Sequence, residues 1–395
     1  MPNNLDSAEH CISRPALGSY KLHTPSSTRP FAGIYSRRKV FITGHTGFKG
    51  GWLALWLKLL EAEVFGYSLD PPTVPSFFEA VGLESLIDYH VIGDVRDGEK
   101  LAAAMQEFRP EFVFHLAAQP LVRISYQDPR LTYETNVMGT INVLEAVRQV
   151  DTVRAAIMVT SDKCYENREW PYGYREIDPM GGYDPYSSSK GCAELVIAAY
   201  IRSFFNPQEY GRSHQVALAS VRAGNVIGGG DWGQDRLVPD CVRALSGSGT
   251  IYIRNPSAIR PWQHVLEPLG GYLLLGAKLW TDGSQYTGAW NFGPPDEEVL
   301  TVEEIVKEVI RLWGEGRYQV DSNEHPHEAH WLKLDCSKAR IKLGWRSKLT
   351  VRQALAKTVE WYKRFYEGAG LEEMQIFTQK QIEEYMGICS DILEN

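Results

Sequence analysis

Tyr186 and Lys190 form the first pair of residues whose types and spacing could do chemistry. They open a helical stretch that runs to Tyr200, and residues four positions apart lie on one face of a helix. A nearby ammonium favours phenolate, so we expect the pKa of Tyr186 to fall from about 10 towards neutrality. Such a tyrosine can take a proton from a hydroxyl group. The same spacing also occurs by chance on surface helices, so this interpretation needs support from other residues.

Support comes from the tripeptide Ser161-Asp162-Lys163, which follows the apolar run at 155–159. That run is typical of a buried parallel strand, and ligands bind at the carboxyl ends of such strands. A serine there could share a substrate proton with Tyr186, while Asp162 and Lys163 supply an acid and a base side by side. A solvated turn is the alternative, but the combination with Tyr186 favours a reaction centre.

A third pattern, Gly44-x-x-Gly47-x-x-Gly50, lies between an apolar run at 40–42 and a helical pattern at 52–63. Glycines allow a tight turn and close backbone approach to a pyrophosphate, which faces the helix N-terminus. The pattern therefore predicts a dinucleotide site. The expected acidic residue after the second strand, Asp70, comes slightly late, yet NAD remains favoured over NADP. Asp94 is placed to meet the adenine, or is an exposed loop carboxylate.

The elements that position these residues alternate along the chain. Apolar runs at 64–67, 112–116, 155–159 and 216–221 are separated by helical patterns such as 131–147, and Thr301 with Glu304 forms a capping box for a later helix. This order predicts an α/β fold with a doubly wound parallel (Rossmann) sheet and a smaller, irregular C-terminal substrate domain. We expect a disordered extension at 1–33, an NAD-binding domain at 34–224, a substrate domain at 225–365 with some segments returning to the first domain, and a helical extension at 366–395.

Composition limits the possible partners. The chain has 395 residues, 44% of them hydrophobic, and a net charge of −8, so no global positive field attracts nucleic acid or an anionic membrane. No apolar run approaches the roughly 20 residues of a membrane helix. Six scattered cysteines indicate reduced thiols in a cytoplasmic protein. The histidines at 325, 327 and 330 lack the ligands that would complete a zinc site, so we expect no metal.

Together these residues resemble the extended short-chain dehydrogenase/reductase family, which combines such a glycine loop with Tyr-x-x-x-Lys after a serine or threonine at a strand end. Residues 40–50, 114–123, 160–167 and 260–265 further resemble the sugar-nucleotide 4,6-dehydratases that act on CDP-glucose, and Lys163 replaces the glutamate of the dTDP-glucose and GDP-mannose enzymes. The resemblance implies a catalytic set of Ser161, Asp162, Lys163, Tyr186 and Lys190. It implies NAD contacts from Gly44, Thr46, Gly47, Phe48, Gly50, Asp94, Val95, Leu116, Ala117, Ala118, Tyr186 and Lys190.

For the substrate, the resemblance implies contacts from Gln119, Asn225, Arg236 and Arg260, with Asn136 in a structural role below the site. These two arginines belong to a sequence cluster that also holds Arg222 and Arg254, and arginine forks suit phosphate oxygens. The resemblance also implies a homodimer or homotetramer.

The implied reaction is loss of water from CDP-glucose. Tyr186, helped by Ser161 and Lys190, would take the 4-hydroxyl proton as hydride leaves C4 for NAD; Asp162 would protonate the departing 6-hydroxyl, Lys163 would assist at C5, and hydride would return to C6. A lysine base must be deprotonated, which needs desolvation or a neighbouring cation. The alternatives are a sugar-nucleotide 4-epimerase, which needs no acid and base at C5 and C6, and a scaffold that binds NAD without turnover.

Overall fold

A seven-stranded sheet forms the centre of the computed structural model, which describes residues 30–247, 249–295, 300–321 and 332–393. The strand order is β3-β2-β1-β4-β5-β6-β11, and neighbouring strands are parallel. The strands are β1 Lys39–Thr43, β2 Glu63–Ser68, β3 Tyr89–Ile92, β4 Phe112–His115, β5 Ala155–Val159, β6 Ala217–Arg222 and β11 Gly288–Asn291. The predicted doubly wound parallel sheet is therefore confirmed.

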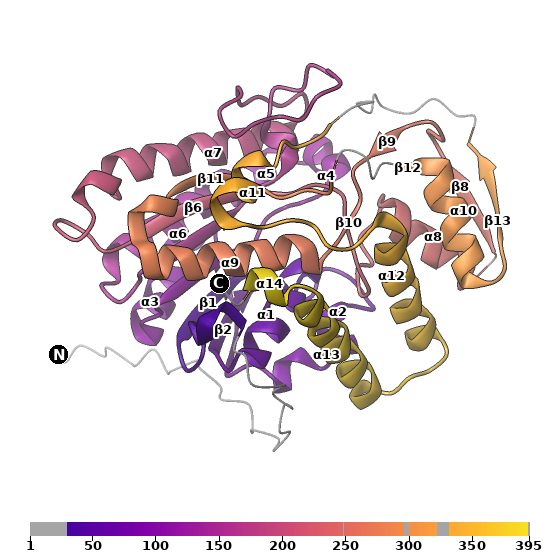
Figure 1. Cartoon of the computed structure of the whole chain (residues 1–395), viewed down its shortest axis with the longest axis horizontal. Helices are drawn as coiled ribbons and strands as arrows, with labels where there is room; N and C mark the ends of the chain where they lie inside the picture. The colour runs from indigo at the N-terminus through magenta and orange to yellow at the C-terminus, as the bar shows by residue number, and fades with distance from the viewer. Residues whose placement is uncertain (1–29, 248, 296–299, 322–331, 394–395) are drawn as a thin grey trace, which may run out of the picture.

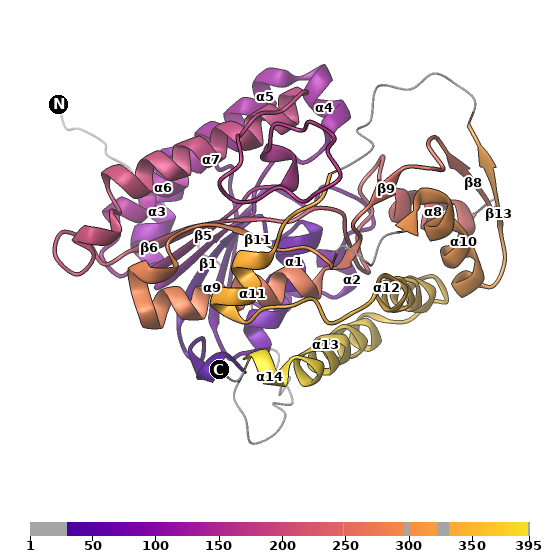
Figure 2. The same ribbon diagram turned by 45° about the horizontal axis from the view of Figure 1, so that its top comes forward.

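Strand β1 shows why helices cover both faces of the sheet. Val40 and Ile42 enter one hydrophobic core, whereas Phe41 between them enters another, because successive strand residues face opposite sides. Helices α1 (Phe48–Leu59) and α9 (Leu266–Asp282) contribute to the first core, and α3 (Gly98–Phe108), α6 (Gly139–Gln149) and α7 (Pro185–Ser203) contribute to the second. The two groups of helices lie on opposite sides of the sheet in Figure 2.

Two helices differ from the periodicity of the sequence. The helix expected at 52–63 starts earlier, at Phe48 directly after Gly47, and ends at Leu59; Glu61, with a φ of 62°, then turns the chain into β2. The stretch at 131–147 is divided into α5 (Pro129–Tyr133), a π-helical turn (Glu134–Met138) and α6. A π-turn often marks a functional position. Here it holds Asn136, whose side chain bonds both Gln119 and Ser189.

Part of the chain after residue 224 builds a second lobe, which lies on the right of the sheet in Figures 1 and 2. Its helices and small sheets are α8 Leu237–Leu245, α10 Val302–Trp313 and α12 Val351–Tyr366, with β7 Val226–Ile227 paired to β10 Gln263–His264, β8 Thr250–Ile253 to β13 Arg317–Val320, and β9 Ile259–Arg260 to β12 Leu300–Thr301. The capping box at Thr301 and Glu304 is present at the start of α10. The chain also returns to the main sheet after 224, because α9 and β11 belong to it.

Both ends of the described chain pack against the first domain. Residues Pro30–Gly33 fall within the extension expected to be disordered, but they form a turn that buries Phe31 beside Trp56. At the other end, α13 (Leu371–Ile388) lies against α1, where the indole of Trp56 donates to Met386 Sδ at 3.3 Å. It is followed by the short helix α14 (Ser390–Leu393). The remaining helices are α2 Phe77–Ala80, α4 Val122–Gln127 and α11 Ser337–Leu343.

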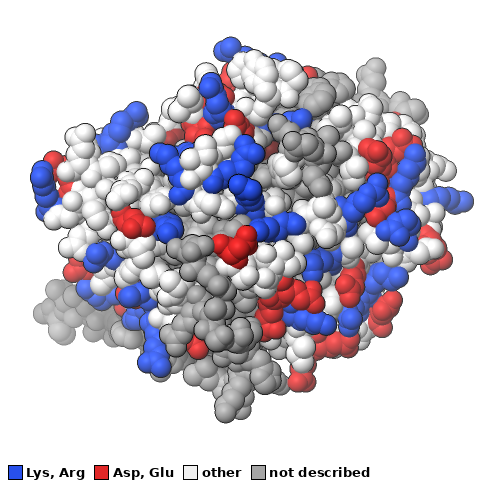
Figure 3. Space-filling model, viewed as in Figure 1, with Lys and Arg blue, Asp and Glu red and all other residues white. Residues whose placement is uncertain are grey.

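Charge on the surface follows the composition. On the face drawn in Figure 3, basic and acidic side chains are interspersed. Within the described residues, no helix has the length and apolar character that crossing a membrane requires.

Candidate active site

The glycine loop lies between the ends of β1 and β4, where the strand order changes direction. Gly44 has a φ of +81°, and a Cβ there would lie 2.7 Å from Ala117 N, so glycine permits this close approach. A Cβ on Gly50 would lie 2.1 Å from Gly44 O. Gly47 caps α1 without a side-chain hydrogen bond, so the first N–H groups of the helix remain available to an anion. This cradle fits the diphosphate of a dinucleotide.

The segment after β4 completes the wall of this crevice. Thr43 Oγ1 accepts from Leu116 N and Ala117 N, both at 3.2 Å, which fixes the backbone at 116–118 against the glycine loop. Sequence reasoning assigned these residues to the cofactor, and the structure brings them next to Gly44. Phe48 packs beside Gly228 of the second lobe, so the glycine loop also contacts that lobe.

At the predicted adenosine end of the cofactor site, several side chains form hydrogen bonds with other residues of the protein. Thr46 Oγ1 lies 2.8 Å from Ser68 Oγ and donates to Leu69 O, which ties the loop to the end of β2. Asp94 accepts two hydrogen bonds from the Arg96 guanidinium, which helps to lower the pKa of its carboxyl against the effect of burial. Val95 is buried against Gly139, and Asp70 is exposed.

Ser161 and Asp162 lie together at the carboxyl end of β5. Both are buried, and Ser161 Oγ donates to Asp162 Oδ1 at 2.9 Å. A Cβ on Gly224 would lie only 1.8 Å from Asp162 Oδ2, so glycine after β6 leaves the space that the carboxylate uses. A narrow cavity opens beside Asp162, and Gly224 and Lys333 are among the residues that line it. The two predicted residues are therefore at one site.

Tyr186 reaches the same site from the first turn of α7. Asp184 caps this helix by accepting from Ser187 N at 3.0 Å, and Pro185 occupies its first turn. The expectation for the Tyr186 phenol is wrong: burial raises its pKa to about 12, with Asp162 adding to the rise and Ser161 and Arg236 opposing it. The reason is desolvation, which disfavours phenolate more strongly than the nearby cations favour it.

Lys190 follows one turn later and is also buried. Burial lowers the pKa of its ammonium to about 8, and the carboxylate of Glu194 opposes that shift. Tyr186, Lys190 and Glu194 thus share a helix face. In contrast, Lys163 is exposed on the turn that follows β5. The structure therefore brings four of the five predicted catalytic residues into a buried group and leaves Lys163 at its edge.

Sequence reasoning missed Lys49 as a site residue. It lies in the first turn of α1, half-buried, and burial with the charges of Arg236 and Lys190 lowers its pKa to about 8, while Asp162 and Asp231 oppose the shift. A signal was present in the sequence, because the positive end of the helix dipole disfavours a cation in a first turn. The same residue follows Phe48 within the glycine loop.

The predicted substrate contacts have different surroundings. Arg236 forms an ion pair with buried Asp231 at 2.8 Å and acts electrostatically on Tyr186, so it borders the reaction centre. Asn225 is half-buried with a φ of 49°, and Arg260 lies in β9 of the second lobe. Gln119 uses its side chain internally: it donates to Thr132 Oγ1 and accepts from Leu121 N.

The other two arginines of the sequence cluster serve the protein itself. Arg222 is buried in an ion pair with Glu194, and Arg254 pairs with Asp235 at 2.7 Å. The described residues hold no group of three or more side chains that could bind a metal ion. The histidines at 325, 327 and 330 lie outside the described residues, as does Cys11; the five described cysteines are free thiols.

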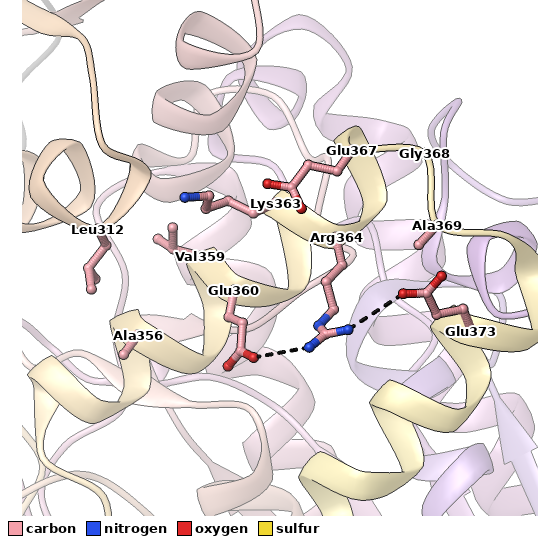
Figure 4. Close-up of a pocket in the computed structure, with 10 residues that line it drawn as sticks. All are labelled: Leu312, Ala356, Val359, Glu360, Lys363, Arg364, Glu367, Gly368, Ala369 and Glu373. Atoms are coloured by element: carbon pink, nitrogen blue, oxygen red, sulfur yellow. Dashed lines mark hydrogen bonds and ion pairs between the residues drawn. The ribbon is translucent and has the colours of Figure 1, made fainter.

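A second hollow, between α12 and α13, contains none of the predicted residues (Figure 4). Three of its charged side chains pair with each other: Arg364 lies 3.7 Å from Glu360 and 3.5 Å from Glu373. The predicted catalytic residues therefore lie around Asp162 and Tyr186 and not at this larger groove.

A glycine cradle at the switch point of a parallel sheet, with Tyr186 and Lys190 beside a polar strand end, defines an extended short-chain dehydrogenase/reductase. Within that class, the sequence model of the family described as GDP-mannose 4,6 dehydratase matches residues 41–358. The chain belongs to this family, which confirms the resemblance in the sequence.

Two relatives and two solved structures show how far the likeness extends. The CDP-glucose 4,6-dehydratase of Salmonella typhimurium (strain LT2) is 56% identical over 354 residues, which are 89% of this chain and 97% of the relative. The dTDP-glucose 4,6-dehydratase of Xanthomonas campestris is 25% identical over 346 residues, covering 81% and 92%. The solved dTDP-glucose 4,6-dehydratase of Bacillus anthracis in complex with NAD has a TM-score of 0.67 at 22% identity, covering 83% and 97%.

The UDP-glucose 4-epimerase of Brucella ovis in complex with NAD has a TM-score of 0.69 at 22% identity, covering 81% of this chain and 97% of that chain. Because this epimerase and the Bacillus anthracis dehydratase match the chain equally well, these two structures show the fold alone. The choice between dehydration and epimerisation depends on the site.

Proposed function

We propose that this protein is an NAD-dependent lyase that converts CDP-glucose to CDP-4-dehydro-6-deoxyglucose and water. The observation that carries the proposal is the buried carboxyl of Asp162, which lies beside Ser161 at 2.9 Å and acts on the phenol of Tyr186. An epimerase has no need of an acid at this position. The 56% identity to a CDP-glucose 4,6-dehydratase over most of both chains supports the nucleotide and the sugar.

The glycine cradle supports NAD as the cofactor, because it leaves the backbone N–H groups at the start of α1 open to a diphosphate. When bound, NAD supplies a hydride acceptor for C4, a hydride donor for C6 and a positively charged ring that favours phenolate. Tyr186 takes the proton of the 4-hydroxyl, with Ser161 as its hydrogen-bonding partner. Lys190 adds positive charge from the same helix face.

The elimination follows from the 4-keto group, which acidifies the hydrogen on C5. Asp162 gives its proton to the departing 6-hydroxyl, so water leaves and not hydroxide. The carboxyl is buried in the space that Gly224 leaves, and this burial keeps bulk water away from the leaving group. The resemblance gives the C5 proton to Lys163, which lies on the adjoining turn.

Arg236 is the first choice for the substrate diphosphate, because it borders Tyr186 and Asp231 orients its guanidinium. Asn225, which directly follows Gly224, and Arg260 of β9 are included in the proposed nucleotide site because the resemblance implies them. The internal bonds of Gln119 favour an indirect role, in which this residue shapes the wall of the site through the backbone at 119–121.

We also propose that the enzyme is a homodimer or homotetramer in the cytoplasm. Tyr133 of α5, Met138 of the π-helical turn and Leu195 of α7 are exposed apolar side chains on neighbouring helical segments. Burying such side chains favours association. Light scattering should give a mass of two or four chains, and Leu195→Glu should shift the protein towards the monomer.

The function is tested by incubating the protein with CDP-glucose and NAD and measuring the product by mass spectrometry. We expect a product lighter by one water molecule and no net formation of NADH, because the hydride returns to the sugar. A CDP-hexose of unchanged mass would contradict the dehydratase and identify an epimerase. An unchanged substrate with bound NAD would favour a scaffold without turnover.

A further inference from the structure

Gln263 is a buried polar residue that the proposed mechanism has not used. It lies in β10, is 2% exposed, and its Nε2 donates to Gly224 O at 3.3 Å and to Phe292 O at 3.0 Å. Because both partners are carbonyl oxygens, the amide nitrogen faces them and Oε1 lies on the other side of the amide group. Within the described residues, Oε1 has no hydrogen-bond partner. Buried acceptors in native proteins are normally paired, so this oxygen points to a ligand that donates a hydrogen bond.

Gln263 also lines the narrow cavity beside Asp162. Gly224 lies between the two side chains: its carbonyl accepts from Gln263, and a Cβ on it would lie 1.8 Å from Asp162 Oδ2. Lys333 is the third polar residue of the lining. The other lining residues have no hydrogen-bonding group in their side chains; they are Gly224, Pro261, Gly293, Pro294, Pro295 and Leu334. A ligand in this cavity therefore meets an acid, a cation and one amide oxygen that can only accept.

The size of the cavity limits the ligand to a small group. The cavity volume of about 10 Å³ is close to what one water molecule needs. A hydroxyl group or a water molecule fits this volume, and each can accept a proton from Asp162 while it donates a hydrogen bond to Gln263. In the proposed reaction Asp162 protonates the 6-hydroxyl oxygen. That hydroxyl therefore reaches the cavity, and its own hydrogen is the donor that Oε1 requires.

We propose that this cavity is the site of the leaving group, where Gln263 Oε1 accepts the hydrogen of the 6-hydroxyl and then holds the water formed from it; this inference rests on the proposed function. Asp162 gives its proton to the 6-oxygen, and the C6–O bond breaks with its electron pair on that oxygen. The C5–H pair becomes the C5–C6 double bond as the C5 proton passes to Lys163, which returns it when hydride reaches C6. Asp162 regains a proton from solvent, which receives the one that Tyr186 took from the 4-hydroxyl.

The consequence is that Gln263 determines specificity for a free 6-hydroxyl group. The hydrogen bond to Oε1 fixes the direction of the O–H bond, so that a lone pair of the 6-oxygen faces Asp162. The product water carries two hydrogens, one from Asp162 and one that was bonded to Gln263 throughout. A substrate without a hydrogen on this position gains nothing from the amide oxygen.

A second buried glutamine shows that an unpartnered oxygen alone does not make such a site. Gln381 of α13 is also 2% exposed, and its Nε2 donates to Lys357 O at 3.0 Å. Its Oε1 likewise has no partner among the described residues. Gln381 does not line the cavity beside Asp162. Position next to the acid is what distinguishes Gln263, and Gln381 is therefore the matched control.

The experiment combines a change in Gln263 with a change in the leaving group. Wild type, Gln263→Met and Gln381→Met are incubated with NAD and either CDP-glucose or CDP-6-deoxy-6-fluoroglucose, whose fluorine can leave but carries no hydrogen. Formation of the 4-keto product gives kcat/KM for each substrate. CDP-6-deoxyglucose has no leaving group, so the NADH that it forms reports oxidation at C4 alone. Thermal unfolding and NAD titration check folding and cofactor binding.

We expect Gln263→Met to lower kcat/KM with CDP-glucose by about 10-fold or more, because one hydrogen bond to the leaving group is lost. The value with the fluoro substrate and the NADH formed from CDP-6-deoxyglucose should change little. Gln381→Met should behave as wild type with all three substrates. An equal loss with the hydroxyl and fluoro substrates would overturn the inference, because a purely structural role of Gln263 affects both alike. An unchanged kcat/KM with CDP-glucose would overturn it as well.

A measurement on wild type tests the same inference if Gln263→Met does not fold. CDP-6-O-methylglucose has an oxygen that Asp162 can protonate, but it has no hydrogen for Gln263 Oε1, and its methyl group exceeds the room for one water. Methanol should leave more slowly than water by about 10-fold or more. Methanol release as fast as water release would overturn the inference while the proposed function stands. If wild type does not dehydrate CDP-glucose, the proposed function fails instead.

Discussion

Arg222 holds Glu194 through a fork of two hydrogen bonds, from Nε at 2.9 Å and Nη2 at 2.7 Å, and both side chains are buried. Glu194 also accepts hydrogen bonds from the hydroxyls of Thr160 and Ser220, so its carboxylate joins β5, β6 and α7. Because Thr160 precedes Ser161 and Lys190 lies one turn from Glu194, this pair fixes two sides of the reaction centre relative to each other.

Breaking this pair should destabilise the whole protein. Replacing Arg222 by Met leaves the Glu194 carboxylate buried without its cation, which should lower the free energy of unfolding by about 3–5 kcal/mol. Urea denaturation measures the change. Arg175→Met is the control, because the ion pair of Arg175 with Asp178 is at the surface and should contribute little. Equal free energies of unfolding for the two variants would show that the buried ion pair contributes no more to stability than the surface pair.

Tyr186→Phe should separate binding from turnover. The phenylalanine ring fills the same buried space but has no proton to exchange with the 4-hydroxyl. We expect kcat to fall by about 10²- to 10⁴-fold while NAD affinity and thermal stability change little. Steady-state kinetics and NAD titration check both quantities. A rate near that of wild type would remove Tyr186 from the role of base.

Gly224→Ala should impair proton donation by Asp162, although Asp162 itself is not replaced. A Cβ at this position would lie 1.8 Å from Asp162 Oδ2, so the carboxyl must move. A displacement of about 1 Å at a reacting group can cost roughly 100-fold in rate. We expect a large loss of kcat with retained NAD binding. Gly387→Ala is the control, since a Cβ there meets nothing within 4 Å; similar activity in both variants would contradict this prediction.

Acid should destabilise the fold below about pH 6.5, the ordinary pKa of histidine. Burial lowers the pKa of His45, His115 and His264 to about 3, so these rings stay neutral in the folded state and take up protons on unfolding. The unfolded state therefore binds more protons than the folded state, so the free energy of unfolding decreases as the pH falls. Burial also raises the pKa of Glu267 to about 6, which offsets part of this effect because the folded state binds that proton.

When the three histidines and Glu267 are taken together, the unfolded state binds about two more protons than the folded state near pH 5.5. The free energy of unfolding should therefore decrease by roughly 3 kcal/mol for each unit by which the pH falls. Urea unfolding at pH 7.5, 6.5 and 5.5 measures the slope. A stability that stays constant between pH 6.5 and 5.5 would show that these histidines are not buried as neutral rings.

Tyr385→Phe should loosen the C-terminal helix. Tyr385 Oη donates to the buried Glu267 Oε2 at 2.8 Å, which connects α13 to α9 across 118 positions of sequence. Loss of this bond leaves a carboxylate oxygen with one partner fewer and should cost about 1–3 kcal/mol in the free energy of unfolding. Amide hydrogen exchange in α13 should rise with it. Unchanged exchange would mean that the apolar contacts of α13 are sufficient.

The sequence by itself determined the order of strands and helices, the glycine loop and the catalytic motifs, because these depend on local periodicity and on residue types at short spacing. The apolar runs at 112–116 and 155–159 became β4 and β5, and Tyr186 with Lys190 came to one helix face. The resemblance to the dehydratases used the same short motifs, and the family match confirms it.

Tertiary structure decided how charges pair and how deeply they are buried. In the folded chain Arg222 forms an ion pair with Glu194, although the sequence grouped that arginine with possible phosphate ligands. Burial in the folded chain raises the pKa of Tyr186, where the sequence predicted a decrease. Tertiary structure also buried Asp162 and left its neighbour in the chain, Lys163, exposed. Spacing along a helix or strand is a local property, whereas desolvation and Coulomb energy depend on every element that packs around a group, so only the folded chain fixes them.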